Sequence, residues 1–166
     1  MLDAVSVARY FIKLDTTNTL FNKNLIQRNG RSFYEGNARL NKYLHIAQNL
    51  YLVKTGTSLF KDNMYAYDNG AVVPSVQESY SVLLKRASEM DSMIPRETEI
   101  FLNRVYAFLR NASLDELIEI SHEDPAWEEK HLYYAKEDQC MNSYAHLEEY
   151  REQYKDALRI MESMTL

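Results

Sequence analysis

Glycine and proline are scarce in this chain, and that scarcity constrains its fold more than any other feature. Only four Gly and three Pro occur in 166 residues, and apolar residues recur mostly at spacings of three and four. This spacing gives a helix one apolar face, whereas Gly and Pro interrupt helices. The pattern predicts a mainly α fold: a single compact helical domain with a small β-hairpin or irregular insert and a C-terminal amphipathic helix.

The order of the helices can be read from apolar stripes and turn residues. We expect five helices before residue 122. The first, second and fifth cover about residues 2–14, 37–54 and 113–121, the third begins at about residue 75, and the fourth ends at about residue 110. The helix at 37–54 is apolar on nearly every side, so it should lie at the centre and end at Gly56. Asn69-Gly70 within residues 63–73 predicts a β-hairpin. Ser75 with Glu78, and likewise Ser113 with Glu116, fits a capping box.

Two segments depart from this regular pattern. Residues 15–36 are rich in polar turn formers and predict a long loop, with at most one short amphipathic turn from Leu20 to Ile26. Pro125 begins the next element, and one or two helices are expected from there to the end. They carry an apolar stripe that must pack against another apolar surface, and a second copy of the chain is one candidate for it. The stripe contains Leu147, Tyr150, Tyr154, Leu158 and Met161.

Charge and composition limit the classes of function. Residues 112–166 contain five Lys/Arg against fourteen Asp/Glu, and the basic excess of residues 1–63 is dispersed. Nucleic-acid binding is therefore not expected. The acidic third could steer a basic protein partner, or it could be a solvated face. The thirteen Tyr and one Trp fit either an interface or a core.

The compartment follows from three observations. Cys140 is the only cysteine, so no internal disulfide is expected. No apolar stretch approaches the roughly 20 residues of a membrane helix. The first residues include Asp3 and an amphipathic pattern, unlike a signal peptide. We expect a cytoplasmic protein without membrane contact.

The sequence offers little that could catalyse a reaction. Its glycines are isolated, so no phosphate-binding loop is expected, and Cys140 falls in a predicted helix without an activating group. None of the four His shows the spacing of a metal site. His122, Glu123 and Asp124 are adjacent and should point apart, with His122 bonded to backbone and Asp124 capping a helix. We expect no catalytic residue, metal or cofactor, with a metal-dependent hydrolase centred on His122 as a remote alternative.

Three short segments in fixed order resemble the Panacea antitoxin domain, also called the SocA-like antitoxin family. Residues 40–48 match its "L-x-K-L-L-Y-x-A-Q" core except at Tyr43 and His45. Residues 66–74 are similar to "A-x-x-x-G-P-V-V-P" except at Ala71, and residues 117–127 resemble "L-x-x-x-x-H … W". The resemblance implies a helical domain at about residues 1–130, with an insert at 15–36. A helical extension at 131–166 has no counterpart.

The resemblance also implies a function. It points to the antitoxin of a type II toxin–antitoxin system, which neutralises a cognate protein toxin by direct binding. The alternative is a proteolytic adaptor that delivers a toxin or another client to a cytoplasmic protease such as ClpXP. The candidate motif or partner-binding residues are Leu40, Lys42, Gln48, Tyr67, Gly70, Val72, Pro74, His122 and Trp127.

Overall fold

The computed structural model describes residues 1–89 and 93–165. In this part of the chain, helices predominate and the β-strands form two small antiparallel hairpins, which confirms the expected fold class. The elements are α1 (Ala4–Leu14), β1 (Leu25–Arg28), β2 (Arg31–Tyr34), α2 (Glu35–Thr55), β3 (Tyr65–Tyr67), β4 (Gly70–Val72), α3 (Pro74–Arg86), η1 (Ala87–Glu89), α4 (Arg96–Leu109), α5 (Leu114–His122), α6 (Pro125–Lys130), η2 (Lys136–Gln139), η3 (Ser143–His146), α7 (Leu147–Gln153) and α8 (Lys155–Glu162).

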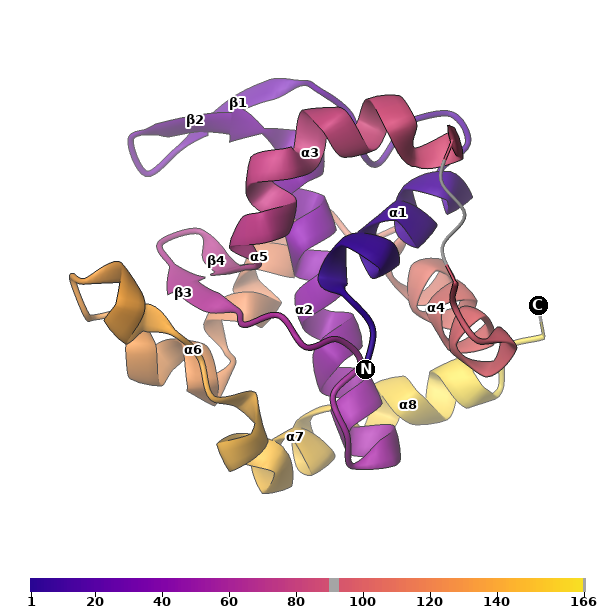
Figure 1. Cartoon of the computed structure of the whole chain (residues 1–166). Helices are drawn as coiled ribbons and strands as arrows, with labels where there is room; N and C mark the ends of the chain where they lie inside the picture. The colour runs from indigo at the N-terminus through magenta and orange to yellow at the C-terminus, as the bar shows by residue number, and fades with distance from the viewer. Residues whose placement is uncertain (90–92, 166) are drawn as a thin grey trace.

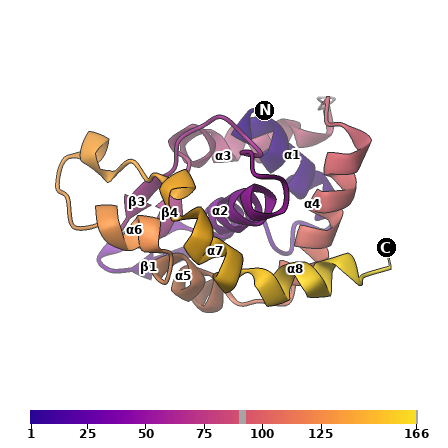
Figure 2. The same ribbon diagram turned by 90° about the horizontal axis from the view of Figure 1, so that it is seen from below.

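Helix α2 is the central element, as expected. The other helices and both hairpins surround it in two perpendicular views (Figures 1 and 2). It is buried on nearly every side, and Gly56 ends it with a φ of 79°. One hydrophobic core joins α2 to residues from both ends of the described chain. None of the helices in that part of the chain is both long and apolar enough to cross a bilayer.

The predicted hairpin at residues 63–73 is confirmed, but its turn differs from the expected one. β3 pairs with β4 so that Tyr67 lies opposite Gly70, which leaves Asp68 and Asn69 as the loop. Only Gly70 takes a positive φ, at 108°. An extra positive-φ Gly after a two-residue turn is the bulge type of hairpin, not the type I′ turn that Asn69-Gly70 suggested.

The expectation for residues 15–36 is wrong, because the segment contains a second hairpin. β1 pairs with β2 around Asn29 and Gly30, whose φ angles are 53° and 74°. Two successive positive φ angles define a type I′ turn, for which Asn-Gly is the preferred sequence. Leu25 and Ile26 therefore belong to a strand and not to a helical turn.

One of the two predicted capping boxes is present. The Ser113 hydroxyl accepts from the Glu116 N–H, and the Glu116 carboxylate accepts from the Ser113 N–H. The capping box predicted at Ser75 is not formed. α3 begins one residue earlier, at Pro74, whose fixed φ suits a first helical position. The Ser75 hydroxyl instead donates to Asp62 Oδ2 at 3.1 Å.

The segment after α6 is less helical than expected. Asp124 caps α6 as predicted, accepting from the Ala126 N–H at 2.7 Å. Residues 131–146 then form only the short turns η2 and η3. Cys140 forms an isolated antiparallel bridge with Tyr65, and the Met141 N–H donates to the Met64 carbonyl at 2.8 Å. This long-range pairing with the chain around β3 requires an extended backbone at Cys140, so Cys140 is not helical.

The C-terminal apolar stripe docks on the chain itself. Tyr150, Tyr154 and Met161 are buried in the common core, and α7 and α8 contact α2 and α4 respectively. The stripe therefore needs no second copy to cover it. This removes the reason for expecting a homodimer through the C-terminal helix.

Candidate functional site

The three motif segments meet at the β3–β4 hairpin, where α2 and α5 bond to its backbone. Lys42 Nζ donates to the Ala71 carbonyl at 2.9 Å, and the Ala71 N–H donates to Ser121 Oγ at 2.7 Å. The Val73 N–H donates to Asn41 Oδ1 at 2.8 Å. Strand β4 is thus held between two helices through its main chain.

Strand β3 and its turn are held from the other side by α5 and α6. His122 Nε2 donates to the Asp68 carbonyl at 3.0 Å, and Trp127 Nε1 donates to the Tyr67 carbonyl at 2.8 Å. The Trp127 indole stacks between the His122 and His131 rings, with centroid distances of 4.2 and 4.0 Å. His122 is tied to backbone, as predicted. We call Asn41, Lys42, Ser121, His122 and Trp127 the hairpin clamp.

Gly70 is the point where the clamp and the hairpin approach most closely. A Cβ at this position would lie 2.5 Å from Lys42 Cε and 2.7 Å from Ser121 Oγ. Its φ of 108° is also one that other residues rarely adopt. Both conditions require glycine.

Lys42 is an unusual member of the clamp because its ammonium is buried. Burial disfavours the charged form and lowers the pKa of Lys42 to about 7. Its stem lies along Gly70, and it borders a cavity of about 180 Å³ between the two hairpins and α2. Ligand pockets usually enclose about 300–1,000 Å³. The volume of this cavity is enough for one inserted side chain but is below that of pockets that hold cofactors. Its walls include Arg31, Phe33, Asn41, Tyr67 and Asn69.

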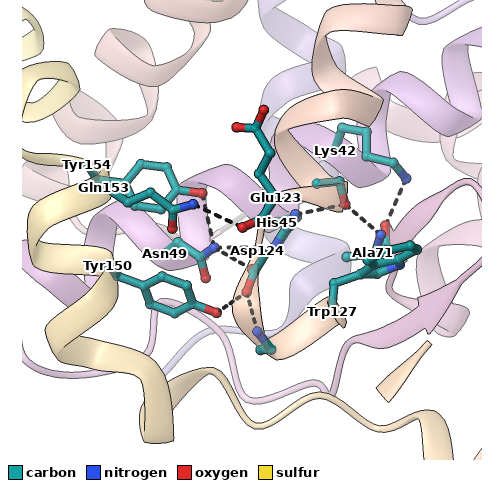
Figure 3. Close-up of polar contacts among 12 residues, drawn as sticks. Lys42, His45, Asn49, Ala71, Glu123, Asp124, Trp127, Tyr150, Gln153 and Tyr154 are labelled. Carbon is teal, nitrogen blue, oxygen red and sulfur yellow. Dashed lines mark hydrogen bonds and ion pairs between the residues drawn. The ribbon is translucent and has the colours of Figure 1, made fainter. Parts of the chain in front are cut away.

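Behind the clamp, a fully buried polar network joins α2, α5 and α6 (Figure 3). His45 Nε2 lies 2.5 Å from Asp124 Oδ2, and His45 Nδ1 lies 3.2 Å from Ser121 Oγ. Because a carboxylate accepts, His45 Nε2 carries a proton and donates it to Asp124, while Nδ1 and Ser121 Oγ share a second hydrogen bond. The network and the hairpin clamp therefore share Ser121.

Three further side chains complete the shell around Asp124. Tyr150 donates its hydroxyl to Asp124 Oδ1 at 2.6 Å, and Asn49 Nδ2 donates to Oδ2 at 3.0 Å. Asn49 also donates to the Tyr154 hydroxyl at 3.2 Å. Burial raises the pKa of Asp124, but the bond and charge of His45 and the bonds from Tyr150 and Asn49 outweigh it, so the pKa falls to about 2. Tyr150 on α7 and Tyr154 directly after this helix tie this part of the chain to the centre of the domain.

Ser121, His45 and Asp124 have the connectivity of a hydrolase triad, but their surroundings do not fit that role. A nucleophilic serine must meet a substrate carbonyl. All three residues are buried, and the Ser121 hydroxyl is enclosed between Ala71 and His45. The arrangement holds β4 and α6 in place.

The His122, Glu123 and Asp124 side chains diverge. His122 turns to the Asp68 carbonyl, Asp124 turns into the core, and Glu123 is exposed. Within residues 1–89 and 93–165, no group of three or more His, Cys, Asp or Glu side chains is placed to hold a metal ion. Among the described residues, His122 is therefore not part of such a group.

The structure brings together most of the sequence-predicted site residues. Five of them gather at the hairpin: Lys42, Tyr67, Gly70, His122 and Trp127. Val72 ends strand β4, and Pro74 begins the helix that follows it. Two others lie elsewhere: Leu40 is a core residue, and Gln48 accepts from the Leu59 N–H at 2.7 Å to fix the loop after α2. Their role as partner contacts is still a prediction.

The His45–Asp124 pair is the part of the site that the sequence did not predict. The sequence marks Asp124 as a helix cap, and His45 as a departure from the family motif and as one of four histidines without the spacing of a metal site. The two residues are 79 positions apart, so no local spacing signals their contact. The available hint was a histidine on a helix that is apolar on nearly every side.

The family model for the SocA-like antitoxin, Panacea domain, matches residues 40–128. The chain belongs to this family of antitoxins. The match runs from α2 into α6 and contains the whole hairpin clamp, whereas α1, the first hairpin and residues 129–166 lie outside it. No curated protein and no solved structure matches the chain.

Proposed function

We propose that this protein is an antitoxin that neutralises a cognate protein toxin by direct, stoichiometric binding. The observation that carries the proposal is the family match over residues 40–128. The geometry supports it, because the polar side chains of the three motifs are occupied in holding the hairpin and not gathered around an open reaction site. In this proposal the motif residues build a rigid platform that supports the surface which meets the toxin.

The adaptor alternative depends on an exposed C-terminal helix as a tether. The apolar face of α7 and α8 is instead covered by α2 and α4. Deleting residues 143–166 would remove Tyr150 and Tyr154 from the buried network and so would disturb the whole domain. We therefore retain direct neutralisation as the proposed function.

Co-expression with the product of the adjacent reading frame tests this proposal. Each gene is placed under its own inducible promoter, so that rescue cannot come from transcriptional control of the toxin. We expect growth arrest by the neighbour alone, rescue by this protein, and a purified complex of fixed stoichiometry in light scattering. Rescue without any complex between the purified proteins would contradict direct binding.

A further inference from the structure

Three consecutive large side chains are exposed on the segment that follows α6. Leu132, Tyr133 and Tyr134 have exposed fractions of 75, 50 and 103%. In two perpendicular views this part of the chain projects away from α2 at the edge of the molecule (Figures 1 and 2). We call these residues the apolar tip. Scattered exposed apolar residues are common, but three in succession on a projection are typical of contact sites.

The backbone of the apolar tip is held in place before any partner arrives. Gln139 Nε2 donates to the Tyr133 carbonyl at 2.8 Å, and the Tyr133 N–H donates to the Lys130 carbonyl at 3.2 Å. Lys130 Nζ also lies 5.6 Å from the centroid of the Tyr133 ring. An ordered loop loses less entropy on binding than a disordered one. Tyrosine adds contact area with few rotatable bonds, which is why it is frequent in binding hot spots.

Both ends of the projection rest on strand β3. Trp127 bonds to the Tyr67 carbonyl before the tip, and Lys136 Nζ lies 5.8 Å from the centroid of the Tyr67 ring after it. The bridge between Tyr65 and Cys140 then fixes the returning chain. The hairpin clamp thus supports the tip through β3, which gives the buried motif residues an effect on the surface.

The surroundings of the tip are acidic. Between residues 128 and 138 there are four carboxylates and two lysines, and all four acidic residues are exposed. Residues 112–166 as a whole carry five Lys/Arg against fourteen Asp/Glu. An apolar projection with an acidic border is complementary to an apolar pocket with a basic border. The four acidic residues are Glu128, Glu129, Glu137 and Asp138.

We propose that the apolar tip, Leu132 to Tyr134, is the contact by which this protein engages its cognate toxin, inserting into an apolar pocket that basic residues surround. The proposal rests on the proposed antitoxin function and names its surface. The tip lies outside the family match at 40–128, so it belongs to this chain's own extension. A partner's affinity then depends on the extension, while the family domain supplies the support.

The test compares full-length variants in binding to the purified toxin. The double variant Leu132→Ser with Tyr134→Ser removes two tip side chains and leaves Tyr133, which contacts Lys130. Because both side chains are exposed, the melting temperature should not change. Hot-spot losses of 2 kcal/mol or more correspond to at least about thirtyfold weaker binding. The matched control is Val82→Ser on α3, which is 57% exposed and should bind like the wild type.

A second arm tests the acidic border. Glu128→Lys with Glu137→Lys should slow association several-fold at low salt and flatten its salt dependence, because steering acts on the association rate. Wild-type affinity in the tip variant overturns the tip proposal while the antitoxin function stands. Failure of the wild type to bind the toxin overturns both. A dimer that only the tip variant breaks, with toxin affinity unchanged, assigns the tip to a second copy and overturns the proposal as well.

Discussion

His45 and Asp124 form a contact at the centre of the domain that links α2 to the cap of α6, with Nε2 2.5 Å from Oδ2 and both side chains fully buried. Tyr150 bonds to the other carboxylate oxygen from α7. A single carboxylate therefore connects the family domain with the C-terminal extension. Because the extension also carries the apolar tip, the pair acts on both the stability of the core and the position of the proposed interface.

Replacing Asp124 should be strongly destabilising. Asp124→Ala removes the acceptor of four donors and leaves His45 and Tyr150 without their partner in the core. Breaking a buried pair from one side costs about 3–5 kcal/mol. Urea unfolding followed by circular dichroism measures this loss. The control Asp156→Ala removes an exposed carboxylate paired with Arg159 and should change the free energy of unfolding by less than about 1 kcal/mol.

Acid should weaken the protein through the same carboxylate. The pKa of Asp124 is about 2 in the folded state, below its ordinary value of 3.8. A depressed acidic pKa contributes stability that is complete above the unfolded pKa and is lost as pH falls through the folded one. The contribution is about 2.5 kcal/mol, and it should disappear between about pH 4 and pH 2. The advantage of the wild type over Asp124→Asn, measured by urea unfolding across that range, should shrink accordingly. An advantage that is constant with pH would contradict this origin.

Local sequence signals predicted the elements better than their meeting points. The stripe of α2, the box at Ser113 and the cap at Asp124 each depend on residues within one or two turns, so the sequence contains them. The first hairpin was also within reach, because Asn29-Gly30 is the same type I′ dipeptide as Asn69-Gly70. The polar composition of residues 15–36 obscured it.

Long-range pairing decided the features that the sequence did not predict. The extended backbone at Cys140 depends on its bridge to Tyr65, which lies 75 positions earlier. The role of Asp124 depends on His45 and Tyr150, which approach it only after α2, α6 and α7 have packed. Periodicity and spacing describe neighbours in sequence. They predicted that the C-terminal stripe must dock but not that its partner is the same chain.

Lys42 should make stability rise with pH above neutrality. Its folded pKa of about 7 lies below the ordinary 10.5, so the unfolded chain binds the extra proton between these values. Stability then increases with pH across that window and is constant below it. Relative to Lys42→Met, which cannot titrate, the wild type should gain about 1 kcal/mol per pH unit between pH 7.5 and 9.5. If the free energy of unfolding has the same pH dependence in both proteins over this range, Lys42 is not a buried, titrating ammonium.

Gly70 provides the sharpest test of how closely the hairpin and its clamp approach. Gly70→Ala combines an unfavourable positive φ with a Cβ placed against Lys42 Cε and Ser121 Oγ. Gly30→Ala is the matched control, because its φ of 74° is also positive but no atom lies within 4 Å of its Cβ. Backbone strain alone costs about 1–2 kcal/mol, and overpacking adds about 1–3 kcal/mol.

We therefore expect Gly70→Ala to lose about twice the free energy of unfolding that Gly30→Ala loses, as measured by urea unfolding. The fluorescence of Trp127, the chain's single tryptophan, provides a second readout. Its indole bonds to Tyr67 at the start of the same turn, so a displaced hairpin changes its surroundings in Gly70→Ala and leaves them unchanged in Gly30→Ala. Equal losses in the two variants, with identical spectra, would mean that the hairpin does not pack against Lys42 and Ser121 as closely as these distances require.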